Sequence, residues 1–120
     1  MRLKEIASVL GCDVVCGQEK LDIEVSSCYA ADMMSDVLAF ATPHCLLVTG
    51  LSSIQSVHTA DMVECSAIVL ISGKRPAPDV LQLALTRGIP ILSTPRSMYE
   101  VCGVLSPHVP ASEKSAGRNR

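Results

Sequence analysis

Hydrophobic residues near the start of the chain recur at helical spacing and then give way to β-rich runs. Leu3, Ile6, Ala7 and Leu10 fall on one face of a helix, and Gly11 follows as a C-terminal stop. The runs "DVVCG" and "LDIEVSSCYA" come next, and the second alternates apolar and polar residues. We interpret them as strands that form a half-buried antiparallel pair or a pair of edge strands.

Further along the chain, amphipathic helices alternate with wholly apolar strands. One helical pattern begins at Met34, two more cover 52–64 and 76–88, and the last ends at Leu105. Buried strands are predicted at three apolar runs: 45–49, 67–71 and 89–92. Because continuous apolar strands joined by helices form parallel sheets covered on both faces, we expect an α/β fold. The predicted architecture is a three-layer sandwich with a mainly parallel sheet flanked by helices.

The end of the chain has a different composition. After residue 105 the segment "SPHVPASEKSAGRNR" loses hydrophobic periodicity and gains Pro, Ser and charged residues. The pattern predicts one α/β domain over residues 1–105 and a disordered C-terminal tail over 106–120.

Composition narrows the class of protein and its partners. Hydrophobic residues make up 48% of the chain and charged residues 18%, which is more apolar than a small core requires and predicts a subunit interface, most simply a homodimer. With one Phe, two Tyr, no Trp and no basic stripe, the chain does not look like a nucleic-acid binder. No apolar run approaches the ~20 residues that span a bilayer. We therefore expect a cytoplasmic protein.

The cysteines do not form a recognisable metal motif or disulfide framework. There are six, and with no apolar signal segment before them we expect them to be reduced and mostly buried. Cys12 and Cys16 are separated by three residues rather than two, and no second pair or nearby His completes a zinc set. No metal site is predicted from them.

Polar residues follow every predicted parallel strand. Parallel strands end at the same edge of a sheet, and ligands of open α/β sheets bind there. Glycines, hydroxyls and a lysine at such an edge suit a phosphate or carboxylate. The same residue types are also ordinary helix caps, as Ser97 with Glu100 illustrates. The candidate ligand-binding residues are Asp32, Ser35, Asp36, Thr49, Gly50, Ser72, Gly73, Lys74, Ser93 and Thr94, with Arg75 and Arg96 as further positive charge.

Catalytic groups are not predicted at this edge. His44 precedes a strand at the opposite edge, His58 lies within a helix, and His108 lies in the tail. Neither GxGxxG nor GxxxxGK[ST] occurs. Asp32 and Asp36 have the spacing to hold Mg²⁺, but such a pair is more typical of a helix cap and a solvated carboxylate. We assign no catalytic residue, cofactor or metal.

Three segments make the chain resemble the DRTGG domain family, particularly its short stand-alone members. In order, they are "LKEIASVLGCDVVCG", "ADMMSDVLAFA" and "AIVLISGKRPAPDVLQLALTRGIPILSTPRSMYEVCGVL". The resemblance covers residues 1 to about 105, and "DMMSDVLA" and "GIPILSTPRSMYE" are its most specific parts. It implies an α/β sandwich of the type found at the N-terminus of HPr kinase/phosphatase, usually dimeric. No Asp-Arg-Thr-Gly-Gly string occurs in this chain, so a ligand contact carried by that string is not implied.

The resemblance also implies a regulatory or assembly role. DRTGG domains occur with CBS domains in regulated pyrophosphatases, within phosphate acetyltransferases, and as single-domain proteins encoded near iron-only hydrogenases. The first hypothesis is a non-catalytic module that binds a small anionic metabolite or nucleotide, or docks on a metabolic or hydrogenase-linked partner. The second is a phosphoryl or acyl transfer enzyme with Asp32 or Asp36 as base and Lys74 as charge stabiliser. The third is a purely structural protein-interaction subunit.

Overall fold

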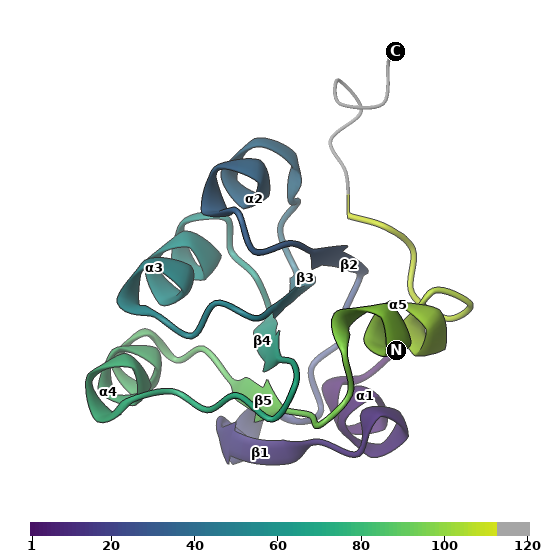
Figure 1. Ribbon diagram of the computed structural model, residues 1–120, viewed down its shortest axis with the longest axis horizontal. Coiled ribbons are helices and arrows are strands. Elements are labelled where there is room, and N and C mark those ends of the chain that lie inside the picture. The colour runs from purple at the N-terminus through teal and green to yellow at the C-terminus, as the bar shows by residue number, and fades with distance from the viewer. Residues whose placement is uncertain (113–120) are drawn as a thin grey trace.

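The computed structural model describes residues 1–112, which form a single five-stranded sheet with helices on both sides (Figure 1). Along the chain the elements are α1 (Leu3–Leu10), β1 (Asp13–Cys16), the 3-10 turn η1 (Gln18–Lys20), β2 (Ser27–Ala30), α2 (Met34–Phe40), β3 (Cys45–Thr49), α3 (Ile54–Met62), β4 (Ala67–Leu70), α4 (Pro78–Arg87), β5 (Ile91–Ser93) and α5 (Met98–Leu105).

The strands lie in the order β1-β5-β4-β3-β2. Strands β2 to β5 pair in parallel, and β1 pairs antiparallel with β5. The three predicted buried strands are confirmed as β3, β4 and β5. The two β-rich runs near the start are a pair of edge strands, at opposite edges of the sheet, so the alternative of an antiparallel pair is wrong.

The alternating run was expected to be part of a long second strand, but its backbone bonds instead to the residues at the start of α1. The Leu3 N–H donates to the Ile23 carbonyl at 3.0 Å, and the Val25 N–H donates to the Met1 carbonyl at 2.9 Å. The apolar side chains of this run therefore pack with α1, and β2 starts only at Ser27.

Successive residues of the central strands face different helical layers. Cys45 and Leu47 belong to the core beneath α2, α3 and α4, whereas Leu46 and Val48 belong to the core beneath α1 and α5. Figure 1 shows these two groups of helices on opposite sides of the sheet. Burial on both faces explains why β3 is wholly apolar up to Thr49. The predicted three-layer α/β sandwich is confirmed.

The residues after α5 differ from the predicted disordered tail as far as the structure describes them. Val109 is only 4% exposed. The Cys28 N–H donates to the Pro110 carbonyl at 2.9 Å, and the Ser112 N–H donates to the Cys28 carbonyl at 2.8 Å. Segment 106–112 thus covers the outer edge of β2, whose backbone groups would otherwise lack a partner strand. The rest of the predicted tail, 113–120, lies outside the described residues.

None of the helices within residues 1–112 is both long enough and apolar enough to cross a membrane.

Candidate ligand site at the carboxyl edge of the sheet

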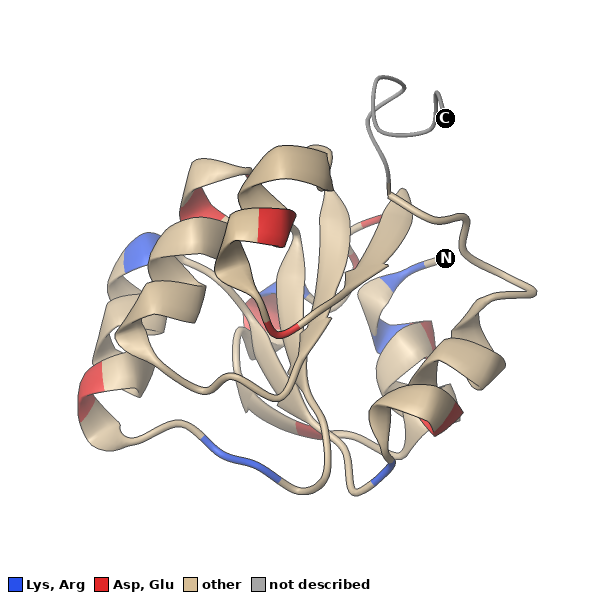
Figure 2. Cartoon of the chain, turned by 45° about the horizontal axis from the view of Figure 1, so that its top comes forward, with Lys and Arg blue, Asp and Glu red and all other residues tan. Residues whose placement is uncertain are grey.

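The loops after β3, β4 and β5 leave the sheet at one edge. Thr49 is in register with Leu70, and Leu70 with Ser93, so the three strands end side by side. At the lower edge of Figure 2, basic residues lie on neighbouring loops. The structure therefore brings together the loops that carry most of the predicted ligand-binding residues.

Gly50 is held between an acidic and a basic side chain. Its N–H donates to Asp32 Oδ1 at 2.7 Å, and its carbonyl accepts from Lys74 Nζ at 3.1 Å. The Thr49 hydroxyl also donates to Asp32 Oδ1, at 3.1 Å. A Cβ on Gly50 would lie 3.3 Å from Lys74 Nζ and 3.4 Å from Asp32 Oδ1. Asp32, Gly50 and Lys74 tie the loops after β2, β3 and β4 to one another, and we call these three residues the Gly50 clamp.

Asp32 was expected to cap α2, and the structure shows otherwise. The N-cap position is Met33, so Asp32 lies one residue before it, and α2 has no side-chain cap. The carboxylate instead turns to the neighbouring strand end, where a backbone N–H and a hydroxyl are available. Ser35 and Asp36 lie in the first turn of α2, and both are exposed.

The loops after β4 and β5 are joined by their backbones. The Ser72 N–H donates to the Arg96 carbonyl, and the Gly73 N–H donates to the Thr94 carbonyl, both at 2.8 Å. Ser72 and Gly73 both have left-handed backbone conformations, with φ of 56° and 70°. The Ser93 hydroxyl donates to the Lys74 carbonyl at 2.7 Å. These bonds hold Ser72, Gly73 and Lys74 as an exposed turn.

The structure buries three predicted ligand-binding residues. Thr94 is fully buried, and its hydroxyl donates to the Leu10 carbonyl of α1 at 2.7 Å, so it faces away from the crevice. Thr49 is also fully buried, and Ser93 is 4% exposed. Their hydroxyls are used within the protein, so these residues support the loops and do not offer a ligand contact. The sequence places them at the strand ends but does not show which face they point to.

Lys74 is an exposed cation at this edge that retains free donors. Arg75 forms an ion pair with Asp13, whereas no residue within 1–112 forms an ion pair with Lys74. Its ammonium has three donors, one of which the Gly50 carbonyl accepts. An anion at the surface of the clamp would therefore find a charge that no carboxylate neutralises by direct contact.

Metal and acid–base chemistry find little support in this geometry. Within the described chain, no group of three or more His, Cys, Asp or Glu side chains is placed to hold a metal ion. His44 lies before β3 at the other end of the sheet, His58 in α3, and His108 beyond α5. None of the three lies in the loops that carry Asp32 and Lys74.

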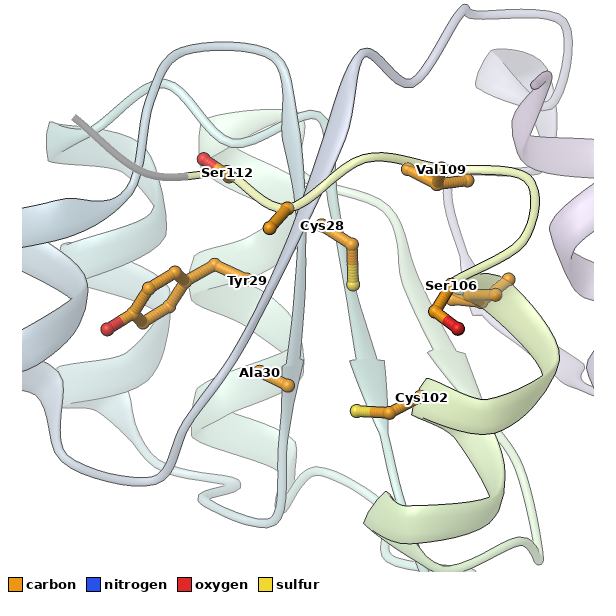
Figure 3. A pocket seen from close by; sticks show the side chains of 9 residues that line it. Cys28, Tyr29, Ala30, Cys102, Ser106, Val109 and Ser112 are labelled. Atoms are coloured by element: carbon orange, nitrogen blue, oxygen red, sulfur yellow. The ribbon is translucent and has the colours of Figure 1, made fainter. Parts of the chain in front are cut away.

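A pocket beside β2 was not predicted from the sequence. It has a volume of about 370 Å³ and lies between β2, α5 and segment 106–112. In Figure 3 the sulfur atoms of Cys28 and Cys102 point toward the space between β2 and α5. Burial raises the pKa of the Cys28 thiol to about 12 and also raises that of Cys102, so both stay protonated and weakly reactive at neutral pH. Val109, an apolar residue set between two prolines, is the sequence feature that could have indicated that this segment packs against an apolar surface.

Comparisons with known proteins agree with this architecture. The fold is similar to the crystal structure of the CBS and DRTGG domains of the regulatory region of Clostridium perfringens pyrophosphatase, which was solved with its activator diadenosine tetraphosphate. The TM-score is 0.73 at 14% sequence identity, and the match covers 95% of this chain and 51% of that chain. Our chain thus spans about half the length of that crystallised regulatory region. Comparison with curated proteins found no match.

A family model gives the more specific result. The model of the DRTGG domain matches residues 5–107, which is most of the chain and includes all five strands, most of α1, the helices α2 to α5 and the Gly50 clamp. This chain belongs to the DRTGG domain family.

Proposed function

We propose that this protein is a non-catalytic regulatory module that binds a small anionic ligand at the Gly50 clamp. The observation that carries the proposal is the exposed ammonium of Lys74, which is fixed by the Gly50 carbonyl and has no acidic partner among the described residues. Its position at the carboxyl edge of a parallel sheet is where ligands of such sheets bind.

The rigidity of the loops supports binding. Asp32 holds Gly50, and the backbone of Ser72 and Gly73 is bonded to the loop after β5. A ligand that contacts this edge would need to order few further groups, which lowers the free-energy cost of binding. The C. perfringens regulatory region binds a polyphosphate nucleotide as its activator. Nucleotides are accordingly the first ligands to test, followed by acyl phosphates and simple anions.

Replacing Lys74 with glutamine is expected to abolish stabilisation by the ligand. In a thermal-shift screen of these anions, a ligand at 100 times its Kd stabilises the folded protein by ~2.7 kcal/mol, which raises Tm by several degrees. The Lys74→Gln variant loses the charge and should show no shift. Lys4→Gln is the matched control, since Lys4 pairs with Asp22 elsewhere on the molecule. An unchanged shift in Lys74→Gln, or no shift with any anion, would contradict the proposal.

A turnover assay with the same ligands separates binding from catalysis. A phosphoryl or acyl transfer enzyme would consume its ligand, with Asp32 as base and Lys74 stabilising charge. Asp32 Oδ1 already accepts two hydrogen bonds that hold the loops, and this favours a structural task for the carboxylate. Turnover in the wild type that disappears in Asp32→Asn, while the variant keeps its Tm, would support the enzyme instead.

A second candidate function is docking of a second copy of the chain on the layer of α2, α3 and α4. Met62 is 71% exposed and Leu85 is 54% exposed. Met62 of α3 lines a surface hollow together with Leu38 of α2, and an ion pair between Asp61 and Arg87 joins α3 to α4, which carries Leu85. Met33, Leu38 and Ile54 add exposed apolar area to the same layer. A homodimer that buries this surface would explain the high apolar content.

Charged substitutions on this layer are expected to dissociate the homodimer. Multi-angle light scattering should give a dimer mass for the wild type and a monomer mass for Met62→Glu combined with Leu85→Glu, because burying unpaired carboxylates is costly. Tyr99→Glu is the matched control: Tyr99 is 88% exposed but lies on α5, in the other layer. A monomeric wild type, or a dimer that survives the double substitution, would rule out this interface.

A further inference from the structure

Two thiols lie in contact at the end of the sheet opposite the Gly50 clamp. Cys45 Sγ and Cys65 Sγ are 3.3 Å apart. Cys45 is the first residue of β3, and Cys65 lies in the turn between α3 and β4. Both belong to the core beneath α2, α3 and α4, so their side chains share one face of the sheet.

The backbones on either side of the two cysteines are fixed to each other. The Ser66 N–H donates to the Cys45 carbonyl, and the His44 N–H donates to the Glu64 carbonyl, both at 2.8 Å. Parallel pairing of β3 with β4 continues from this point. The register of β3 with β4 extends to Ser66 opposite Cys45, so Cys65 is offset by one residue. A strand spacing of ~4.8 Å and a rise of ~3.3 Å per residue place the two Cα atoms roughly 6 Å apart, within the ~4.4–6.8 Å that disulfides span. A bond between the two sulfur atoms therefore requires little movement of the backbone.

The two thiols differ in how easily a reagent reaches them. Cys45 is fully buried, whereas Cys65 is half-buried. The hydrogen bond from Cys65 lowers the pKa of the Cys45 thiol, and the same bond together with burial raises the pKa of Cys65. Once the pair has lost one proton, the two sulfur atoms share the proton that remains. The negative charge then belongs to the pair, and either sulfur can carry it. Thiol–disulfide exchange requires a thiolate that the oxidant can reach, and transfer of the shared proton to Cys45 places the charge on the more accessible Cys65 sulfur.

We propose that Cys45 and Cys65 form a site of reversible oxidation, at which a low-molecular-weight disulfide converts the two thiols into an intramolecular disulfide. After the pair has lost one proton to solvent, Cys45 takes up the proton that remains between the two sulfur atoms. The accessible Cys65 sulfur, now the thiolate, attacks one sulfur of the oxidant, whose other half leaves and takes a proton from solvent to become a thiol, so that a mixed disulfide remains on Cys65. Cys45 loses its proton and attacks Cys65 Sγ, which releases the second half of the oxidant. The cysteines lose two electrons and two protons, and the oxidant is reduced to two thiols. The site lies apart from the Gly50 clamp and does not depend on the proposed function.

Peptide mapping of the oxidised protein tests this pairing directly. The reduced, folded chain is incubated with glutathione disulfide, blocked with N-ethylmaleimide and cleaved before aspartate residues under denaturing conditions. Cleavage at Asp36, Asp61 and Asp79 yields peptide 36–60, whose only cysteine is Cys45, and peptide 61–78, whose only cysteine is Cys65. We expect these two peptides to form the main cross-linked product, and we expect a reductant to remove the link.

Two variants control the experiment. Cys65→Ser should lose the cross-link and leave Cys45 unmodified, because Cys45 is buried. Cys12→Ser removes a half-buried cysteine elsewhere and should keep the cross-link. Glutathione that stays on Cys65 without closing the bond, a different main pairing, or no reaction in the folded protein would each overturn the proposal. The wild-type map gives these outcomes even if a variant fails to fold.

Discussion

Replacing Gly17 with alanine is expected to lower the free energy of unfolding by about 3 kcal/mol, through backbone strain and a steric clash. Gly17 follows β1 with a φ of 89°, in the left-handed region that L side chains rarely adopt. A Cβ built there would lie 2.5 Å from Pro90 Cβ and 2.6 Å from Pro90 Cα. Pro90 cannot easily yield, since its carbonyl accepts a hydrogen bond from the Ile68 N–H at 2.9 Å. Denaturant unfolding monitored by circular dichroism measures the loss.

Gly11→Ala separates the clash from the strain. Gly11 ends α1 with a φ of 64°, and an added Cβ there would meet no atom within 4 Å. This variant should cost only ~1 kcal/mol, the strain of the left-handed conformation. Equal losses in the two variants would show that the approach of Gly17 to Pro90 does not matter for stability.

Hydrophobic periodicity was enough to predict the helices and the central strands because it depends only on local sequence and burial. A continuous apolar run such as 45–49 has few alternatives to a strand buried on both faces. Periodicity does not identify the strand with which an edge strand pairs. The β-rich run at 13–16 pairs with β5, about 80 residues later in the sequence, and nothing in its own pattern identifies that partner.

The candidate site, too, could be predicted only in part from the sequence. Parallel topology predicts that Thr49, Lys74 and Thr94 follow strands that end together, and the structure brings their loops to one edge. Whether a side chain faces the crevice or the core depends on pleat and on neighbouring elements. Thr94 faces α1, and Asp32 faces Gly50, because those neighbours supply the hydrogen-bonding groups each side chain lacks. No motif in the sequence records those neighbours.

Ending the chain after Leu105 is expected to destabilise the domain by roughly 3–5 kcal/mol, from lost burial of Val109 at ~2 kcal/mol and lost hydrogen bonds at ~1 kcal/mol each. The bonds are those that join Cys28 to Pro110 and Ser112, and that join the Thr42 N–H to the Ser112 hydroxyl at 2.7 Å. Such a loss is a large fraction of the stability of an ordinary domain. Denaturant unfolding of the truncated chain measures it.

A second truncation, after Ser112, keeps all of these contacts and should unfold at nearly the denaturant concentration of the full chain. The first truncation also uncovers the outer edge of β2, and an open strand edge pairs readily with other chains. We therefore expect it to aggregate on concentration, which light scattering detects, while the second stays dispersed. If both truncations unfold alike, the contacts of Val109 and Ser112 contribute little, and the domain ends at residue 105 as its hydrophobic periodicity predicts. If only the first is unstable, the family fold in this chain includes a C-terminal segment that completes its sheet edge.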